Sequence, residues 1–256
     1  MILNYLDILQ SYNLSWLQWF AIGLAAFLLG LSKAGIKGIG IILVVILAFV
    51  FGEKTSTGIL LPMLICADIL AVIYYHRHAQ WKYIVKLLPM MIVGVLAGVW
   101  LGNDISEIIF KKLMAIIIIG SVILMFLAEN RKSTAVPKSK GFSWIMGFLA
   151  GFTTMIGNLA GPVANIYFLA IRIPKNEFIG TAAWLFFIIN LFKLPFHMFV
   201  WKTVNIQTLT LNTALIPAVI AGFIVGVALV KRISNLNYRR FILAVTAIGG
   251  MILLFK

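Results

Sequence analysis

Residues 89–113 read PMMIVGVLAGVWLGNDISEIIFKKL, and residues 217–241 repeat the same pattern as PAVIAGFIVGVALVKRISNLNYRRF. The identities include the proline that opens each copy and both glycines of a Gly-x-x-x-Gly pair, and a Phe-Lys-Lys run becomes Tyr-Arg-Arg. Many secondary transporters are internally duplicated, mainly apolar chains whose substrate site lies where the two copies meet. The repeat therefore predicts two copies of one membrane unit.

The composition is that of a membrane protein. Hydrophobic residues make up 62% of the 256 residues, charged residues make up 11%, and the mean hydropathy is +1.07. A soluble domain of this size could not carry so much apolar surface without aggregating. The formal net charge of +14 would suit nucleic-acid binding in a soluble chain. Here the basic residues lie in short loops between apolar runs, so we expect membrane lipid as a partner and no nucleic acid.

Cysteine and histidine are too sparse to build a redox or metal site. Cys66 is the only cysteine, which excludes an intrachain disulfide and a cluster of thiolate ligands. His76 and His78 form a His-x-His pair, but no third ligand lies near them, so no metal site is expected. Residues 1–13 contain no Lys or Arg and no small-residue cleavage site, which predicts a retained first helix rather than a signal peptide.

Ten apolar runs follow one another along the chain, five in each half. Most approach the ~20 residues that a spanning helix needs, but runs 38–51 and 159–171 are short and follow glycine-rich tips. Paired short segments at matching places are typical of broken or re-entrant helices. The pattern predicts an all-α integral membrane protein with two inverted-topology repeats, each a broken or hairpin helix pair followed by three transmembrane helices. Residues 14–51 and 142–171 fit either re-entrant hairpins or full spans.

The predicted domain boundaries follow the one polar stretch in the chain. Residues 1–128 form the first membrane repeat, residues 129–141 a cytoplasmic basic linker, and residues 142–256 the second, inverted repeat. If the N-terminus is outside, the inward loops hold about three times as many basic residues as the outward loops. The inward set begins with Lys33 and Lys37. This asymmetry predicts that both termini lie outside.

Two glycine-rich tips carry most of the polar residues that are surrounded by apolar sequence. They read GLSKAGIKGIG at 30–40 and GFTTMIGNLAGP at 151–162. An interrupted helix directs free N–H groups and the positive end of its dipole at whatever fills the gap, so an anion is the expected occupant. The glycines could instead serve only close helix packing. The residues predicted to bind the anion, in the tips and on the run 178–200, are Ser32, Lys33, Gly35, Lys37, Gly38, Thr153, Thr154, Gly157, Asn158, Asn190 and Lys193.

Asp68 is the one acidic residue deep in an apolar run, where an unpaired carboxylate is costly. Its counterpart in the second half is Asn190, and Lys193 lies about one helical turn beyond. In one interpretation Asp68 and Lys193 form a structural ion pair. In the other, Lys193 attracts an anion and Asp68 is a proton-coupling site. His197, a further turn along, could relay a proton or be a hydrogen-bonded structural residue.

Taken together, these landmarks resemble the sulfite exporter TauE/SafE family of bacterial membrane permeases. The first half is similar through its hairpin, Pro62, Asp68, Trp81 and the Gly-x-x-x-Gly helix. The second half is more similar, through GFLAGFTTMIGNLAGPVANIYFLA at 147–170 and Phe-Phe-x-x-Asn-x-x-Lys at 186–193. The first tip departs from the family pattern, because it lacks consecutive glycines and carries two lysines.

The resemblance implies a permease in the bacterial inner membrane that moves sulfite or organosulfur anions by alternating access, with no cofactor. One alternative is a permease for another small solute: a carboxylate, an amino acid or a metal cation. A cation would need several intramembrane carboxylates or His and Cys ligands, and Asp68 is the only such carboxylate. The alternative of another class is a membrane-embedded enzyme. The chain has neither an HExxH nor a GxSxG motif, so no catalytic residues are expected.

Overall fold

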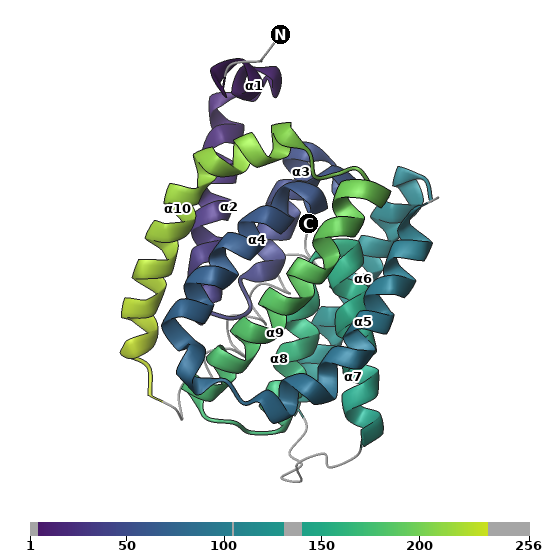
Figure 1. The fold of residues 1–256 in the computed structure, drawn as a ribbon, viewed down its shortest axis with the longest axis vertical. Coiled ribbons are helices and arrows are strands. Elements are labelled where there is room, and N and C mark those ends of the chain that lie inside the picture. Colours follow the sequence, from purple (N-terminus) through teal and green to yellow (C-terminus); the bar gives the residue numbers. More distant parts are fainter. Residues whose placement is uncertain (1–4, 104, 131–139, 235–256) are drawn as a thin grey trace.

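A computed structural model describes residues 5–103, 105–130 and 140–234, and it is helical throughout these ranges (Figure 1). The all-helical prediction is confirmed for this part of the chain. In chain order, the elements are α1 (Tyr5–Ser11), α2 (Trp16–Ala34), α3 (Gly40–Phe51), α4 (Glu53–Tyr75), the 3-10 turn η1 (His76–His78), α5 (Trp81–Asn103), α6 (Glu107–Asn130), α7 (Lys140–Gly157), α8 (Ala160–Ala170), α9 (Lys175–Pro195), the π-helical turn η2 (Phe196–Val200) and α10 (Ile206–Lys231).

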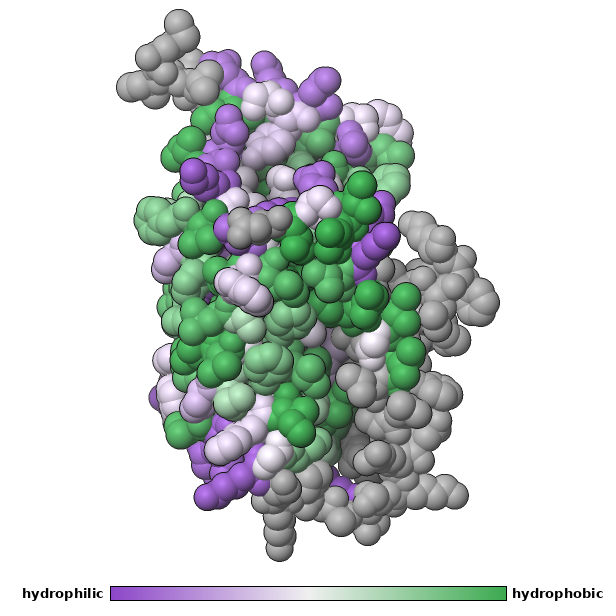
Figure 2. Space-filling view, turned by 90° about the vertical axis from the view of Figure 1, so that its right-hand side faces the viewer, coloured by the Kyte–Doolittle hydropathy of each residue, from purple (hydrophilic) through white to green (hydrophobic). Residues whose placement is uncertain are grey.

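Five of the described helices are long and apolar enough to cross a membrane. They are α2, α4 with η1, α5, α9 with η2, and α10. Large apolar side chains such as Trp16, Phe49, Trp100 and Phe199 are exposed. Figure 2 shows hydrophobic residues gathered in a band between more hydrophilic ends, which is the surface that a bilayer requires.

The helices that follow the two tips are too short to span. α3 has 12 residues and α8 has 11. At ~1.5 Å per residue, 12 residues cover ~18 Å, well short of the ~30 Å hydrocarbon core. Neither short helix can span the bilayer alone, which favours hairpins at α2–α3 and α7–α8 over full spans. The backbone breaks at Gly35 and Gly38, with φ of +126° and +99°, and at Asn158, with φ of +56°.

Glycine allows each hairpin to pack closely against the opposite half of the chain. The most extensive helix pairs are α5 with α7 and α10 with α2. A Cβ added at Gly30 of α2 would collide with the backbone of Val219 on α10, and one at Gly151 of α7 would collide with the backbone of Met91 on α5. These contacts match, because both glycines open a tip and both partners lie two residues after the prolines of the repeated segments.

The Gly-x-x-x-Gly helices, α5 and α10, make the other side of the same close contacts. A Cβ at Gly94 of α5 would meet the backbone of Phe148 on α7, and one at Gly222 of α10 would meet that of Phe27 on α2. Each half thus packs its first hairpin helix on the Gly-x-x-x-Gly helix of the other. α4 and α9 also pack together, and α2 and α7 begin at opposite ends of the molecule (Figure 1).

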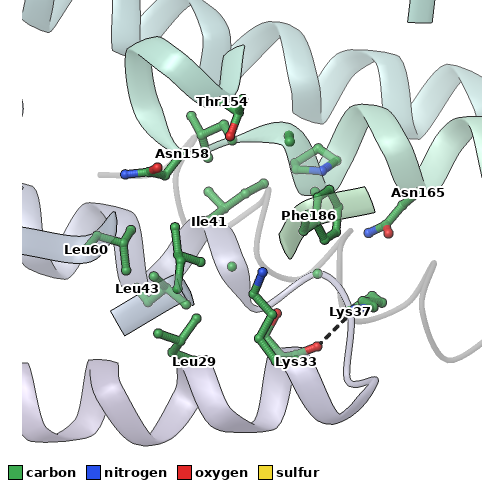
Figure 3. A pocket seen from close by; sticks show the side chains of 18 of the residues that line it. Leu29, Lys33, Lys37, Ile41, Leu43, Leu60, Thr154, Asn158, Asn165 and Phe186 are labelled. Atoms are coloured by element: carbon green, nitrogen blue, oxygen red, sulfur yellow. Dashed lines mark hydrogen bonds between the residues drawn. The ribbon is translucent and has the colours of Figure 1, made fainter. Parts of the chain in front are cut away.

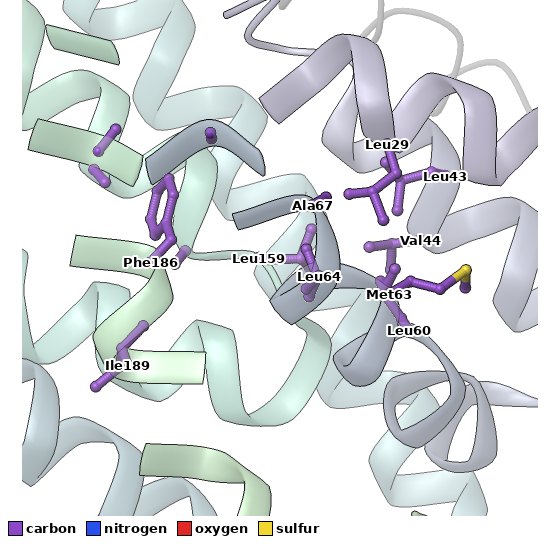
Figure 4. Packing of buried hydrophobic residues seen from close by; sticks show 14 of the residues in the cluster. Leu29, Leu43, Val44, Leu60, Met63, Leu64, Ala67, Leu159, Phe186 and Ile189 are labelled. Carbon is purple, nitrogen blue, oxygen red and sulfur yellow. The ribbon is translucent and has the colours of Figure 1, made fainter. Parts of the chain in front are cut away.

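A continuous apolar core surrounds the tips. Buried side chains from α2, α3 and α4, including Leu29, Leu43 and Leu60, pack together beside Phe186 and Ile189 of α9 (Figure 4). The predicted linker 129–141 lies mainly outside the described residues, and so does the end of the predicted second repeat, from residue 235 onward. α1 is a separate short helix because Ser15 and Gln18 form a capping box that starts α2 anew.

Candidate functional site

The two hairpin tips enclose a cavity of about 70 Å³ (Figure 3). A dry cavity of about 150 Å³ accepts benzene, so this one suits a solute of only a few heavy atoms. Both tips contribute to its wall, with α4 and α9 closing the sides. The polar residues of the wall are Ser32, Lys33, Lys37, Thr154, Asn158, Asn165 and Asn190.

Two helix N-termini face this cavity. α3 begins at Gly40 and α8 at Ala160, and neither has a side-chain cap. Gly40 and Ile41 of α3 and Ala160 and Gly161 of α8 line the cavity. The first N–H groups of a helix have no intrahelical acceptor and lie at the positive end of its dipole. Convergence of two such ends favours an anion between them.

Lys37 brings an incompletely bonded ammonium group to the same wall. Its side chain is buried, and Nζ donates to the carbonyl oxygen of Ser32 at 3.2 Å. Within the described residues this is the only hydrogen bond of a group that has three N–H donors. A buried ammonium with unused donors is a strong attractor for an anion.

Lys33 is shared between the cavity and a buried carboxylate. Its Nζ lies 2.6 Å from Oδ1 of Asp68 and 4.8 Å from the ring centre of Phe186. Lys33 lines the cavity, whereas Asp68 lies behind it and is completely buried. The predicted structural pair of Asp68 with Lys193 is therefore wrong. Asp68 pairs with Lys33 because α2 packs directly on α4.

Lys193 is fully buried and is bonded to the second tip. Nζ donates to the carbonyl oxygen of Thr154 at 2.9 Å, to its Oγ1 at 3.1 Å, and to Oδ1 of Asn158 at 2.6 Å. A longer bond of 3.3 Å reaches Oδ1 of Asn190. Because its donors are used in this way, Lys193 holds the tip in place and does not line the cavity.

The amide of Asn190 connects the two charged groups. Its Nδ2 donates to Oδ2 of Asp68 at 2.7 Å, while its Oδ1 accepts from Lys193. Asn158 extends the network, because its Nδ2 donates to the carbonyl oxygen of Thr57 at 3.0 Å. A chain of hydrogen bonds thus runs from Lys33 through Asp68, Asn190 and Lys193 to the second tip.

The charges around the cavity do not balance. Among the described residues that line it or bond to its wall, three carry an ammonium group and one, Asp68, carries a carboxylate. With all four ionised, two positive charges are in excess in an apolar environment. Such an excess is costly when uncompensated, and a bound anion would offset it. The lysines concerned are Lys33, Lys37 and Lys193.

The structure brings seven of the predicted binding residues together at the cavity wall. They are Ser32, Lys33, Lys37, Gly38, Thr154, Asn158 and Asn190. Three others shape the tips without lining the cavity. Gly35 ends α2 and is packed between Ile179 and Val230. The hydroxyl of Thr153 donates to the carbonyl oxygen of Leu149 on its own helix, and Gly157 is buried at the end of α7.

Lys33 and Lys37 also require a correction to the predicted topology. Both were assigned to an inward loop, but they are only 7% and 4% exposed and lie inside the molecule. The reason is the hairpin, since its tip ends within the protein rather than at a surface. The orientation of the protein in the membrane must therefore be inferred from the basic residues outside this tip.

His197 lies apart from the cavity wall. It is completely buried, its Nδ1 is 2.8 Å from Oγ1 of Thr203, and its ring packs edge-on against Trp201 at 5.1 Å. These contacts fix the orientation of the imidazole ring. Its Nε2 has no partner among the described residues.

The cavity-lining residues that sequence reasoning missed are mainly small or aliphatic, but they include one amide, Asn165 on α8, and one aromatic ring, Phe186 on α9. Asn165 could have been found, because it is the one amide inside the short apolar run after the second tip. Phe186 opens the Phe-Phe-x-x-Asn-x-x-Lys run that supports the family resemblance, but an aromatic residue in an apolar helix gives no sign that it lines a cavity.

A family model described as Sulfite exporter TauE/SafE matches residues 20–253. The match spans nearly the whole chain, including both hairpins and both Gly-x-x-x-Gly helices, and it confirms the resemblance read from the sequence. No match was found among curated proteins or among solved structures.

Proposed function

The chain belongs to the sulfite exporter TauE/SafE family of membrane transporters, and we propose that it is a secondary transporter of a small anion. Sulfite and organosulfonates are the proposed substrate class. The observation that carries this proposal is the excess of buried ammonium groups around a cavity that two helix N-termini also face. Both features favour negative charge, and the cavity is small enough to select for size.

We propose that Lys37, Ser32 and the free N–H groups of α3 and α8 hold the anion. Thr154, Asn158 and Asn190 form the opposite wall, and Lys193 positions that wall through its hydrogen bonds. Lys33 would join the ligand set when the anion enters. The bound solute would then touch both hairpins, which is the arrangement expected at the interface of two repeats.

The proposed transport cycle is alternating access by two inverted repeats. The reciprocal packing of α2 on α10 and of α7 on α5 supports it, because matching residues make matching contacts. The hairpins also start at opposite ends of the molecule (Figure 1). Rocking of one repeat against the other would open the cavity first to one side and then to the other.

Proton coupling at Asp68 is part of the proposal. An anion that draws Lys33 away would leave Asp68 buried with Asn190 as its remaining hydrogen-bond partner. A buried carboxylate that loses its cation favours the neutral, protonated form. Anion binding and proton uptake would then be linked. His197 lies one turn beyond Lys193 and would serve as the relay on the side of η2.

The proposed location is the bacterial inner membrane, with both termini periplasmic. Arg77 in the turn η1 and Lys82 and Lys175 at the starts of α5 and α9, all at the predicted inner end, support this orientation even after Lys33 and Lys37 are removed from the count. The competing cargoes differ in charge. A metal cation would be repelled by the buried lysines, whereas a small carboxylate shares the chemistry of a sulfonate and remains an alternative. A membrane-embedded enzyme is the alternative of another class, and no catalytic group has been assigned in the cavity.

The direct test is anion flux into proteoliposomes with Lys37→Met. Wild-type protein should transport sulfite or an organosulfonate, and the variant should lose this flux because the ammonium with unused donors is gone. Lys86→Met is the matched control, since Lys86 is exposed on α5 and should leave flux unchanged. A panel of sulfite, sulfate, thiosulfate, sulfoacetate and simple carboxylates would identify the preferred anion. Wild-type flux by Lys37→Met would contradict the proposal.

A further inference from the structure

Asn165 is a buried residue whose amide oxygen is left unbonded by the described part of the chain. It is 2% exposed, it lies in the second turn of α8, and it lines the cavity. Figure 3 shows its side chain directed towards the space between the tips, across from Lys33. Its Oδ1 is buried without a hydrogen bond among the described residues. Buried polar groups are nearly always bonded, so an orphan at a cavity wall points to a missing ligand.

The repeat shows that packing does not require this amide. Asn165 lies four residues after Gly161, and Val44 lies four residues after the matching glycine, Gly40. Val44 is 3% exposed and belongs to the apolar core. The same position in the other hairpin is thus filled by an apolar side chain, which would avoid the cost of an unbonded amide.

The other amides of the cavity have their oxygens occupied. Oδ1 of Asn158 and Oδ1 of Asn190 both accept from Lys193. The groups that remain free around the cavity are mainly donors, namely the ammonium of Lys37 and the N–H groups that begin α3 and α8. Of the three cavity amides, Asn165 is therefore the one that still offers an acceptor.

We infer that Asn165 is a ligand of the transported anion and makes the site prefer an oxyanion that carries its own hydrogen-bond donor. This inference rests on the proposed function. The Nδ2 group donates to one oxygen of the anion, and Oδ1 accepts from a protonated oxygen of the same anion. A fully deprotonated oxyanion satisfies the surrounding donors but leaves Oδ1 without a partner, which lowers its affinity.

Sulfate and hydrogen phosphate provide a matched pair of probes for the full-length protein. In mildly alkaline solution both are tetrahedral dianions of similar size, and only hydrogen phosphate carries an O–H. We expect the wild type to bind hydrogen phosphate more tightly than sulfate, as measured by calorimetric titration. Asn165→Val, which installs the residue of the matching position, should weaken hydrogen phosphate binding roughly tenfold and sulfate binding less.

A stability measurement separates this role from a structural one. Without anion, Asn165→Val should melt at a higher temperature than the wild type, by roughly 2–4 °C per kcal/mol of relieved penalty. Asn212→Val is the control, because Oδ1 of Asn212 is also buried without a hydrogen bond among the described residues, but Asn212 does not line the cavity and its Nδ2 donates to the carbonyl oxygens of Ile59 and Thr208 on α4 and α10. The Asn212→Val variant should melt at a lower temperature than the wild type and keep the preference for hydrogen phosphate over sulfate.

The outcomes distinguish this inference from the proposed function. If the wild type does not bind hydrogen phosphate more tightly than sulfate, the inference is overturned. It is also overturned if Asn165→Val leaves the preference unchanged, while the transporter proposal still stands. Failure of the wild type to bind any anion of the wider panel would overturn both.

Discussion

The three buried lysines have different environments, and each environment implies a different role. Lys193 makes four hydrogen bonds to the second tip and to Asn190, Lys33 is paired with Asp68, and Lys37 makes one hydrogen bond. A lysine whose donors are all used stabilises the fold, whereas one with unused donors is available to a ligand. This distinction is measurable with single substitutions.

Lys193→Met should lower stability and transport together. The substitution leaves the amide oxygen of Asn158 buried without a donor, at ~1–3 kcal/mol for the unsatisfied group, and removes one of the two donors to the carbonyl oxygen of Thr154. Lys37→Met should abolish transport while keeping the melting temperature near that of the wild type. Melting in detergent and flux in proteoliposomes would be measured on both. A Lys193→Met protein as stable as the wild type would show that its bonds do not hold the tip.

Asp68→Asn should uncouple anion binding from protons. Asp68 is faced by Lys33 and Lys37 from the first hairpin and by Asn190 and Lys193 from α9. If binding draws Lys33 away and Asp68 takes up a proton, affinity in the wild type rises as the pH falls. The variant has no carboxylate to take up the proton, so the pH dependence of affinity that arises from Asp68 should be lost.

The Asp68→Asn variant and the wild type would each be titrated with an organosulfonate whose charge is constant near neutrality. In weakly buffered solution, a pH indicator reports the protons taken up on binding. Wild-type protein should take up a proton on binding, and the variant should bind without uptake. Identical pH dependence in both proteins would remove Asp68 from the coupling mechanism.

At the scale of elements, the helix breaks at the two tips and the helix-packing glycines could be predicted from sequence, because backbone requirements leave a local signature, whereas the choice between hairpins and full spans could not. Gly35 and Gly38 mark the break after α2, and the Gly-x-x-x-Gly pairs mark α5 and α10. The partner of Asp68 could not be predicted. Lys33 and Lys193 both lie in apolar sequence, and the choice between them depends on how α2 and α9 pack on α4, which is a tertiary property.

For Asn165 and Phe186 of the site, too, the sequence does not show how the helices pack. Both lie on helices that were predicted correctly, but the face of each helix that borders the cavity is decided by the meeting of the two hairpins. The tips themselves were predicted, and most of their polar residues do line the cavity. Thr153 does not, because its hydroxyl bonds back to its own helix, as threonine commonly does.

Gly30→Ala should disrupt the packing of α2 on α10. The added methyl group would collide with backbone atoms of Val219 and Phe223, which cannot move without shifting the helix. Overpacking of this kind costs ~1–3 kcal/mol. Gly23→Ala lies on the same helix with no atom within 4 Å of the added Cβ, and it should leave the melting temperature unchanged or slightly higher. Equal melting temperatures for the two variants would contradict the close approach of these helices.

At the scale of the whole molecule, the first helix of each hairpin packs against the opposite half of the chain. The cavity is therefore lined by residues of both halves. Neither half could form it alone, since Lys37 comes from the first and Asn165 from the second. If one half moved relative to the other, the walls that each half contributes would move apart or together. Such a movement would change access to the cavity, as alternating access requires.

The orientation of the protein can be tested by cysteine labelling in whole cells. In a Cys66→Ser background, Gln10→Cys on α1 and Lys82→Cys on α5 introduce single exposed thiols at opposite ends of the molecule. A membrane-impermeant reagent should label the first in intact cells and the second only after lysis. The reverse pattern would place the termini in the cytoplasm.

The central claim is that an anion binds between the two tips. The most direct measurement is an anomalous diffraction map of the full-length protein with selenite, a heavier analogue of sulfite. A selenium peak is predicted inside the cavity, within hydrogen-bonding reach of Nζ of Lys37 and bordered by Gly161 and Asn165. A peak elsewhere on the protein, with this cavity empty, would contradict the account.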